Sequence, residues 1–337
     1  MHESTLSEEI AAKYLKFAQN EARGRSPLYE ELALGIANDD TILRFLAQFP
    51  PPKRQPNLLF ASVRKVCGTP TGWDEFRQCL TLRCEEIRAV MLTHSTQTNE
   101  PARCATLLPL LALLPQPLAL LEVGASAGLC LLPDRYAYRF NQTDVEPRSN
   151  VGLPVPRFHC AVNSAAPIPQ TNIEVVWRMG LDLEPLNVRD HEHAAWLETL
   201  VWPGEESRLT HVRQALDLAR ADPPTIVRGR LQTDLPALVS QAPRDATLVI
   251  FHSAVLAYVP SERERMEFAA TVERTHAVWI GNESPGVTPG TPGRESTRCL
   301  PGEFLLSQNG KEIAATDPHG RSLRWFEEGA LGDYQAS

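Results

Sequence analysis

The spacing of apolar residues divides the chain into a helical first part and a second part in which strands alternate with helices. In the first hundred residues, apolar side chains recur at three- and four-residue steps, and the longest such face runs from Trp73 to Met91. Helices are predicted to begin near Thr5, at Ser26-Pro27, at Asp39 or Asp40, near Thr71 and at Pro101. Residues 1–115 are therefore predicted to form a helical N-terminal cap.

The periodicity changes after residue 116. Apolar runs rich in β-branched residues, at 118–123, 174–180, 225–230, 246–252 and 277–281, predict strands that are buried on both faces. Helical patterns at 129–140, 190–200, 207–221 and 261–275 separate them, as in an open parallel sheet. The tail, at 304–307, 312–315 and 323–326, has the alternation and turns of antiparallel hairpins. A polar, proline-containing insertion fills residues 141–172, with at most a short strand near 158–162.

These elements predict an α/β protein. Residues 116–337, after the helical cap, are expected to form a Rossmann-like, mostly parallel sheet with an antiparallel C-terminal hairpin. The chain has 337 residues, 43% of them hydrophobic, which is enough for one large domain or two modest ones.

Charge and composition argue against several classes of protein. The formal net charge is −8 and no block of five or more basic residues occurs, so the chain lacks the field that binds long nucleic acid. The N-terminus is acidic where a secretory signal would be basic and then apolar, which predicts a cytoplasmic protein. Three prolines interrupt the most apolar stretch, 107–123, so no membrane span is expected. The seven scattered cysteines are predicted to be reduced core thiols.

The strand that begins at residue 118 ends in an acidic residue, Glu122, and then in a turn of very small side chains. These are Gly124, Ala125, Ser126, Ala127 and Gly128. The glycines can take backbone angles closed to other residues, and the small side chains leave room for a ligand against the main chain. Two chemistries use such a turn: a nucleotide-binding loop, and the Gly-x-Ser-x-Gly elbow of hydrolases, with Ser126 as the nucleophile.

Polar residues also follow the later strands. His252 and Ser253 end one predicted strand, and Asn282 and Glu283 end the next. Because ligands of open α/β sheets bind beyond the carboxyl ends of the strands, these residues are predicted to line one cleft. His252 and Glu283 are the candidate catalytic bases.

Further polar residues are candidate substrate contacts: Asn99, Arg103, Arg178, Tyr258 and Asn282. Arg103 has the fork of donors that suits a carboxylate. No metal site is expected, because His191 and His193 are two residues apart and would diverge on a helix.

The order of these segments resembles class I S-adenosylmethionine-dependent methyltransferases. In that superfamily the turn after the first strand wraps the methionine moiety, an acidic residue after the second strand holds the ribose, and the fourth strand ends near the methyl group. The resemblance implies an S-adenosylmethionine cofactor held by Glu122, Gly124, Ala125, Ser126, Gly128, Asp182 and Ser253. It also implies a small-molecule or peptidic methyl acceptor. Ser126 departs from the usual middle glycine, and the insertion before the second strand is long.

A closer resemblance covers most of the chain. Four segments, at 97–105, 121–129, 134–138 and 251–258, are similar in order to the bacterial family labelled domain of unknown function 2332. That label names relatives and implies one recurring fold, but it carries no activity.

Two other functions stay open. A serine hydrolase would use Ser126 with Asp234 or Asp317 and with His252, His276 or His319, although the helical region before the turn does not suit that fold. A catalytically silent nucleotide-fold binding module is the other, since the fourth strand lacks the Asn-Pro-Pro-Tyr tetrapeptide of many amino-methylating enzymes. The leading prediction is a methyltransferase.

Overall fold

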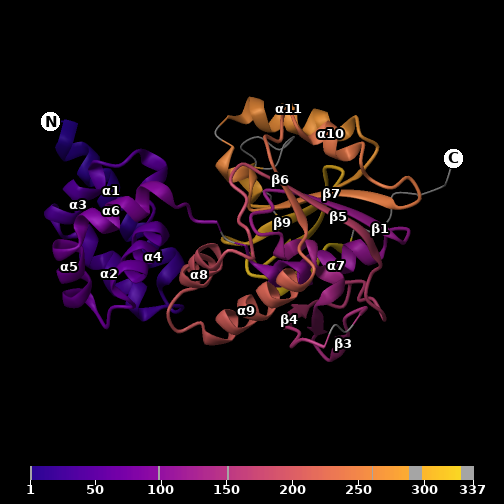
Figure 1. The fold of residues 1–337 in the computed structure, drawn as a ribbon, viewed down its shortest axis with the longest axis horizontal. Helices are drawn as coiled ribbons and strands as arrows, with labels where there is room; N and C mark the ends of the chain where they lie inside the picture. Colours follow the sequence, from indigo (N-terminus) through magenta and orange to yellow (C-terminus); the bar gives the residue numbers. More distant parts are fainter. Residues whose placement is uncertain (1, 98, 150–151, 260, 288–297, 328–337) are drawn as a thin grey trace. The chain divides into compact units, whose positions relative to one another are not determined.

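The computed structural model describes residues 2–97, 99–149, 152–259, 261–287 and 298–327. The chain forms two compact units (Figure 1). Unit 1 consists of Met1–Thr98 and Glu192–Thr210, and unit 2 consists of Asn99–His191 and His211–Ser337. Residues 99–115, which the apolar spacing assigns to the helical cap, are part of unit 2.

Unit 1 is helical. Its elements are α1 (His2–Phe17), the π-helical turn η1 (Ala18–Ala22), α2 (Pro27–Ala37), α3 (Asp40–Ala47), η2 (Pro51–Lys53), α4 (Pro56–Cys67), α5 (Trp73–Leu82) and α6 (Cys84–Thr93). Most of α8 (His191–Leu200) and the start of α9 (Glu206–Ala221) complete it. The predicted starts at Ser26 and Asp39 are confirmed, because the Ser26 Oγ accepts from the Tyr29 N–H at 3.4 Å and Asp39 accepts from two backbone N–H groups.

The helix predicted from Thr71 to Met91 is in fact two helices. The chain leaves helical geometry at Arg83, where φ is −121° and ψ is 27°. Phe76 and Ile87 lie on opposite sides of this break but are buried in the same cluster. Apolar spacing could not reveal the break, because both helices turn their apolar faces toward one core.

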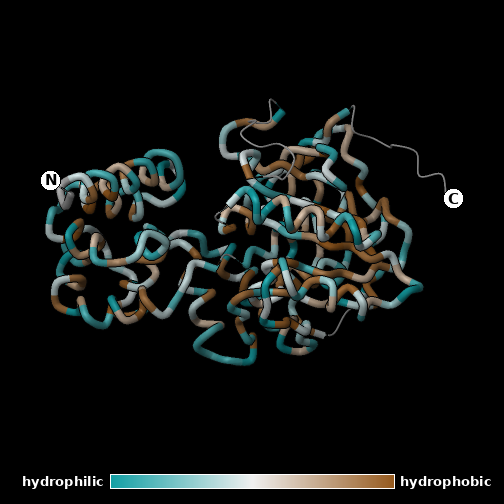
Figure 2. The backbone as a smooth tube through the Cα atoms, turned by 90° about the horizontal axis from the view of Figure 1, so that it is seen from above, coloured by the Kyte–Doolittle hydropathy of each residue, from teal (hydrophilic) through white to brown (hydrophobic). Residues whose placement is uncertain are grey.

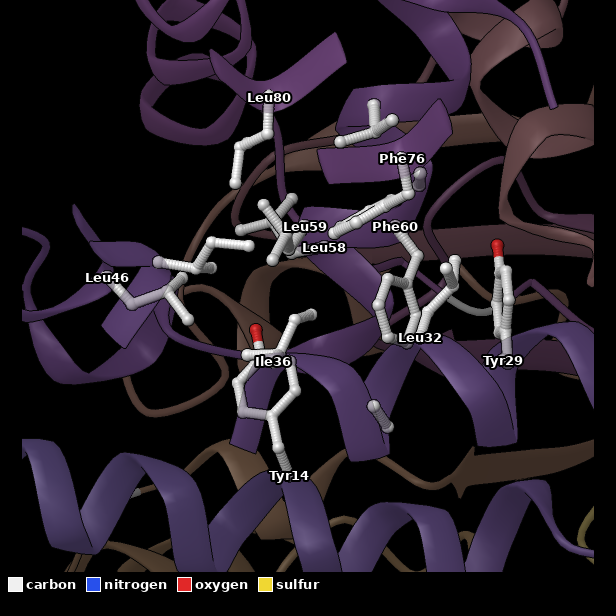
Figure 3. Packing of buried hydrophobic residues seen from close by; sticks show 14 of the residues in the cluster. Tyr14, Tyr29, Leu32, Ile36, Leu46, Leu58, Leu59, Phe60, Phe76 and Leu80 are labelled. Carbon is white, nitrogen blue, oxygen red and sulfur yellow. The ribbon is translucent and has the colours of Figure 1, made fainter. Parts of the chain in front are cut away.

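The core of unit 1 combines aliphatic side chains with a group of aromatic rings (Figure 3). The ring of Phe60 lies 4.6 Å from that of Tyr29 and 5.8 Å from that of Phe76. Trp202, from the distant segment 192–210, packs its ring 5.4 Å from Tyr29 and 5.4 Å from Phe17. Unit 1 is thus built from two separate stretches of sequence.

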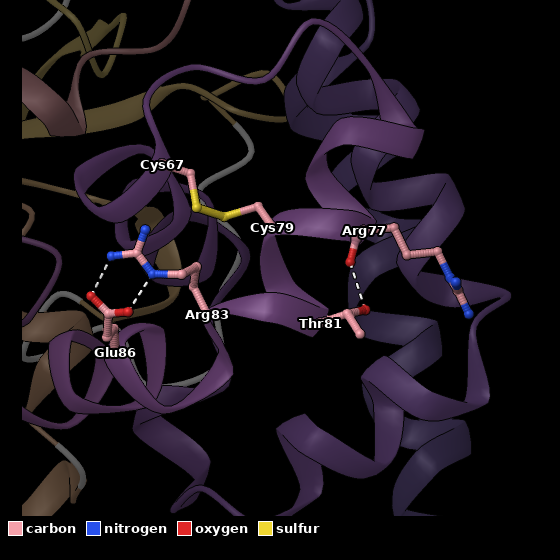
Figure 4. The surroundings of a disulfide bond; sticks show 6 residues. All are labelled: Cys67, Arg77, Cys79, Thr81, Arg83 and Glu86. Atoms are coloured by element: carbon pink, nitrogen blue, oxygen red, sulfur yellow. Dashed lines mark hydrogen bonds and ion pairs between the residues drawn. A yellow bond between two sulfur atoms is a disulfide. The ribbon is translucent and has the colours of Figure 1, made fainter.

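A disulfide joins Cys67, at the end of α4, to Cys79 on α5 (Figure 4). The prediction that all seven cysteines are reduced is therefore wrong for this pair. Composition could not show it, because pairing depends on two helices meeting across a loop. The other five cysteines are free thiols.

Unit 2 is built on one mixed sheet. Its strands are β1 (Leu118–Val123), β2 (Ala137–Phe140), β3 (Thr143–Val145), β4 (Arg157–Val162), β5 (Val175–Asp182), β6 (Thr225–Arg228), β7 (Thr247–Ser253), β8 (Val278–Glu283), β9 (Phe304–Gln308), β10 (Lys311–Thr316) and β11 (Ser322–Trp325). Their order is β3-β2-β4-β11-β10-β9-β8-β7-β1-β5-β6. The five neighbouring strands β6, β5, β1, β7 and β8 run parallel to one another. The strands β9, β10 and β11 form the predicted antiparallel tail.

Helices cover both faces of the parallel strands. The segment η3 (Pro101–Arg103) with α7 (Cys104–Ala112) and the end of α9 lie on one face, and α10 (Leu235–Val239) with α11 (Glu262–Glu273) lies on the other (Figure 1). Leu121, Ile250 and Phe268 pack together beneath α10 and α11. The predicted α/β class with a mostly parallel sheet is confirmed.

The helix predicted at 129–140 is wrong. Two short 3₁₀ turns, η4 (Leu129–Leu131) and η5 (Pro133–Arg135), follow the glycine turn, and β2 comes next. Pro133 cannot supply a helical N–H, and the alternating residues Tyr136, Tyr138 and Phe140 favour a strand. The glycine turn therefore does not open an α-helix.

The remaining short elements include η6 (Leu256–Tyr258) and η7 (Pro285–Val287). Figure 2 shows hydrophobic and hydrophilic residues alternating along the helices of unit 1, and hydrophobic runs within unit 2. Among the described residues, no helix combines the length and apolar character that crossing a bilayer requires.

Candidate functional site at the carboxyl edge of the sheet

The turn after β1 has an unusual backbone. Gly124, Ser126 and Gly128 all have positive φ, at 73°, 51° and 74°. Such angles are easy for glycine but strained for serine, and strain of this kind concentrates at functional sites. The turn lies next to β5 and β7, which flank β1 in the sheet.

Protein groups already hold most of this turn. The Gly124 N–H donates to the Leu181 carbonyl oxygen at 2.8 Å, and the Gly128 N–H donates to the Ala125 carbonyl oxygen at 2.6 Å. Asn99 donates from Nδ2 to the Ala125 oxygen at 3.0 Å, and its Oδ1 accepts from the Leu129 N–H at 2.9 Å. Asn99, a predicted substrate contact, thus fixes the shape of the turn.

Side chains also pack against the two glycines. A Cβ atom at Gly124 would lie 2.3 Å from Cγ2 of Val255, and one at Gly128 would lie 2.6 Å from Cγ of Pro224. The glycines are therefore required by packing inside the protein as well as by their backbone angles. The small side chains leave less open space over the turn than the sequence pattern indicates.

Asp182, at the end of β5, stands beside the turn as predicted. Its Oδ2 accepts from the Ser126 N–H at 2.8 Å and its Oδ1 accepts from the Glu184 N–H at 2.8 Å. A carboxylate has about four acceptor positions, so each oxygen of Asp182 can take another donor.

Glu122 is the most unusual residue of the site. It is only 3% exposed, and its Oε2 has no hydrogen-bond partner among the described residues. Burial, with Cys130 and Asp182 nearby, raises the pKa of its carboxyl group well above the usual value, although Arg103 opposes this shift. The surroundings of Glu122 therefore favour the protonated form of its carboxyl group, and a nearby cation would favour the ionised form.

Two serines at the same edge share this property. Within the described part of the chain, neither Ser126 Oγ nor Ser253 Oγ has a partner, although both atoms are buried. Buried polar atoms without partners are uncommon, and each calls for water, an ion or a ligand to satisfy it. Glu122, Ser126 and Ser253 supply three such atoms around the ends of β1 and β7.

His252 and Glu283 form a closed network. Glu283 Oε1 lies 2.7 Å from Nδ1 of His252, and Nε1 of Trp279 donates to Nε2 of the same ring at 3.0 Å. Because Trp279 can only donate, Nε2 is the acceptor and the proton of the neutral ring lies on Nδ1. Glu283 also accepts from the backbone N–H groups of Val255 and Leu256. Both ring nitrogens of His252 are engaged, as is the carboxylate of Glu283.

The predicted site residues are divided between the two faces of the sheet. Consecutive residues of a strand point to opposite faces. His252 faces α11, where its ring lies 5.5 Å from that of Phe268. Asn282, next to Glu283 in β8, faces α7 and donates from Nδ2 to the Thr106 Oγ1 at 3.4 Å.

Glu122 is on the same face as Asn282. Its strand neighbours Leu121 and Val123 pack beneath α10 and α11, so Glu122 points the other way. Arg103 completes the group on this face. It is 5% exposed and donates from Nη1 to the Ser253 carbonyl oxygen at 3.1 Å and from Nε to the Pro318 carbonyl oxygen at 2.8 Å.

The remaining predicted substrate contacts are separated. Arg178 forms a two-pronged ion pair with Asp134, with distances of 3.1 and 3.0 Å, and also donates to the Leu131 carbonyl oxygen. Tyr258, on η6 after β7, has 61% of its surface exposed. Asn282 is fully used, because its Oδ1 also accepts from the Thr316 Oγ1 at 2.7 Å.

The metal-ligating residue types and the surface cavities of the described residues indicate no stronger candidate site. Among the described residues, no three His, Cys, Asp or Glu side chains are arranged to hold a metal ion. Three surface cavities of about 710, 340 and 400 Å³ lie beside β11, α11 and α5 respectively, and the glycine turn lines none of them.

Several partners in these networks could not be found from the sequence. Trp279 and Asp134 are the partners of His252 and Arg178, and each is distant from its partner in the chain. His319, in the turn between β10 and β11, lies 3.6 Å from the buried carboxylate of Glu100. The sequence pointed to Asp134 only through its place in a family-like segment, and to His319 only as a candidate histidine of the alternative hydrolase.

Comparison with known proteins identifies a family for this chain but no individual curated protein or solved structure. One family model matches residues 11–325, which include every candidate site residue of both sheet faces. The chain therefore belongs to the family described as "Uncharacterized protein conserved in bacteria (DUF2332)".

Proposed function

We propose that this protein is an S-adenosylmethionine-dependent methyltransferase that acts on a small-molecule or peptidic acceptor. The observation that carries the proposal is a set of three buried polar atoms at one sheet edge, from Glu122, Ser126 and Ser253, that have no hydrogen-bond partner among the described residues. Around them lie a strained turn and an acidic residue with spare acceptor positions, Asp182.

The strand order supports a ligand at this edge. The parallel strands are arranged β6-β5-β1-β7-β8, so the chain moves outward in one direction from β1 and then returns to its other side at β7. In doubly wound sheets of this order, ligands bind in the crevice at the carboxyl ends of the strands where the order reverses. Here that point lies between β1 and β7, beside Glu122 and Ser253.

The chemistry of the donors and acceptors fits the cofactor. Asp182 suits the two hydroxyls of a ribose, because each of its oxygens can accept another hydrogen bond in addition to the one from a backbone N–H. Glu122 suits a positively charged group, since such a group would draw the proton from this buried carboxyl. The cofactor itself supplies the activated methyl group, and the protein would hold an acceptor in line with it.

The face of the sheet on which each residue lies supports a different role for each group of residues in this proposal. In this proposal Glu122, Ser126, Ser253 and Asp182 hold the cofactor, and Asn99 keeps the turn in shape. His252 and Glu283 hold the loop at Val255 and Leu256 from the opposite face. They act as positioning residues, because a base needs an available acceptor atom near the substrate.

One observation favours the serine hydrolase. The positive φ of Ser126 is typical of a nucleophile elbow. Two observations weigh against it. The Ser126 Oγ has no hydrogen-bond partner within the described residues, whereas a nucleophile contacts its base, and the elbow should open a helix that is not present here.

Isothermal titration with S-adenosylmethionine and S-adenosylhomocysteine tests the proposal. We expect both to bind the wild-type protein, and Ser253→Ala to weaken binding about five- to tenfold by removing a hydrogen bond to the ligand. Ser253 is preferred to Gly124 as the test position, because any side chain at Gly124 would strike Val255 and disturb the fold.

Ser62→Ala is the matched control. Ser62 is a buried serine of unit 1, and its replacement should leave cofactor affinity unchanged. Absence of heat and of any thermal shift at millimolar cofactor would refute the methyltransferase. Stoichiometric labelling of Ser126 by a fluorophosphonate would establish the hydrolase in its place.

A further inference from the structure

The turn between β10 and β11 rests on the polar segment before α7. Nε of Arg103 donates to the Pro318 carbonyl oxygen at 2.8 Å. Gly320 has a φ of 77°, and a Cβ atom there would lie only 2.0 Å from the Ala102 carbonyl oxygen. The two backbones are in direct contact, so the terminal hairpin is docked onto η3.

A second contact across this interface depends on charge. Nδ1 of His319 lies 3.6 Å from Oε2 of Glu100, which is beyond hydrogen-bond distance but close enough for an ion pair. Glu100 is 3% exposed, and its Oε1 accepts from the Ala102 N–H at 3.3 Å. A buried carboxylate gains strongly from a cation at this distance, so protonation of His319 should tighten the contact.

The docked turn is linked to the end of β7 through one side chain. Arg103 bonds to the Pro318 oxygen with one nitrogen and to the Ser253 oxygen with another. Ser253 is one of the three residues with unpartnered buried atoms. The position of the turn therefore bears on the position of this edge.

Asp317 is a second carboxylate near His319, and the charge of His319 contributes to lowering the pKa of Asp317. Asp317 accepts from the His319 N–H at 2.9 Å, but it is also paired with Arg321 at 3.3 Å. Burial opposes ionisation of Asp317, yet Arg321 and backbone N–H groups prevail and lower its pKa.

A histidine of another element, His211, also interacts with Glu100. Burial lowers the pKa of His211 on α9, while Glu100 acts to raise it and His159 on β4 to lower it. Burial therefore favours the neutral form of His211, whereas His319 lies within ion-pair distance of Glu100.

We infer that His319 and Glu100 form a charge-dependent latch that holds the 317–320 turn on η3 and, through Arg103, positions the end of β7. The link to cofactor binding rests on the proposed function, whereas the latch itself does not. Histidine ordinarily becomes charged below about pH 6.5. The latch is therefore closed in mildly acidic solution and loosens as the pH rises.

Hydrogen exchange of the full-length protein without cofactor tests the latch. We expect peptides that span 317–322 to exchange about three- to tenfold faster at about pH 8 than at about pH 6, after correction for intrinsic rates. Peptides of β9 should show no such change. In His319→Gln and Glu100→Gln the difference should vanish, while His319→Lys, with a permanent charge, should stay protected at both pH values.

The two proposals fail separately. A wild-type difference that persists in both His319→Gln and Glu100→Gln overturns the latch, whatever the cofactor result. If S-adenosylhomocysteine binds, its affinity should fall about three- to tenfold over the same pH range in the wild type but not in His319→Gln. Equal affinities at the two pH values in the wild type would show that the latch does not reach the site.

Discussion

At the scale of single residues, burial decides which polar groups are unusual. Glu122 was predicted to be a site residue because it ends an apolar strand. Among the described residues its Oε2 has no hydrogen-bond partner, which is consistent with that prediction. His252 was chosen for a similar reason, but both of its ring nitrogens are engaged by Glu283 and Trp279. A sequence shows that a polar residue lies in an apolar strand, but it does not show whether that residue has a hydrogen-bond partner in the folded protein.

Glu122→Gln tests the protonation of this buried carboxyl. The folded protein raises the pKa of Glu122 above its ordinary value of 4.5, so its neutral form contributes stability at low pH that is lost as the pH rises. Glutamine has no proton to lose. Relative to the wild type, the free energy of unfolding of Glu122→Gln should therefore rise between about pH 5 and pH 8, by up to about 1.4 kcal/mol per unit.

Urea unfolding at several pH values measures this difference. Glu9→Gln, at an exposed position on α1, is the control, and its difference from the wild type should stay flat. A Glu122→Gln difference that is equally flat would mean that Glu122 is ionised in the folded protein.

At the scale of elements, capping and turn residues predicted the ends of helices and strands correctly, whereas the expected alternation of strands and helices did not always hold. Ser26 and Asp39 begin their helices as predicted, because an N-cap acts on its own first turn. The Asn309-Gly310 turn joins β9 to β10 for the same local reason. The helix expected at 129–140 was wrong because a local preference for strand, with Pro133, outweighed the expected strand–helix rhythm.

The disulfide between α4 and α5 carries the prediction at this scale. It closes a loop across a sequence separation of 12, so reduction should lower the free energy of unfolding of unit 1 by about 2 to 3 kcal/mol. Thermal melts with and without a phosphine reductant measure the effect, and the shift should be absent in Cys67→Ser/Cys79→Ser.

Cys84→Ser is the matched control, because Cys84 is a free thiol on the neighbouring helix α6. This variant should keep the full response to reductant. Peptide mapping without reduction gives a direct check, and unlinked Cys67 and Cys79 peptides would contradict the pairing.

At the scale of the whole molecule, the chain forms two units whose sequences interleave. The segment Glu192–Thr210 belongs to unit 1, although it lies in the sequence between the two stretches that form unit 2. Trp202 of this segment is buried against Phe17 and Tyr29, and the guanidinium of Arg25 lies 4.9 Å from its ring. The helical unit is therefore incomplete without a segment that follows about a hundred residues later in the sequence.

Trp202→Ala tests this organisation. Removal of a large buried ring should destabilise unit 1 by about 3 kcal/mol or more. Leu82→Ala, at a position that is 71% exposed in the same unit, should cost less than about 0.5 kcal/mol. Urea unfolding followed by circular dichroism at helical wavelengths compares the two, and similar small losses would show that the segment does not belong to the core of unit 1.

The sequence by itself determined the α/β class, most strands and helices of unit 2, the antiparallel tail and the glycine turn that follows Glu122. These follow from local periodicity, capping and backbone freedom, which act over a few residues. Only the tertiary structure decided which face of the sheet each polar residue occupies, and whether Arg178, His252 and Asn282 find partners. Those outcomes depend on side chains that are distant in the chain. The last two residues of a strand point to opposite faces of the sheet, so adjacent residues meet different neighbours that the sequence does not reveal.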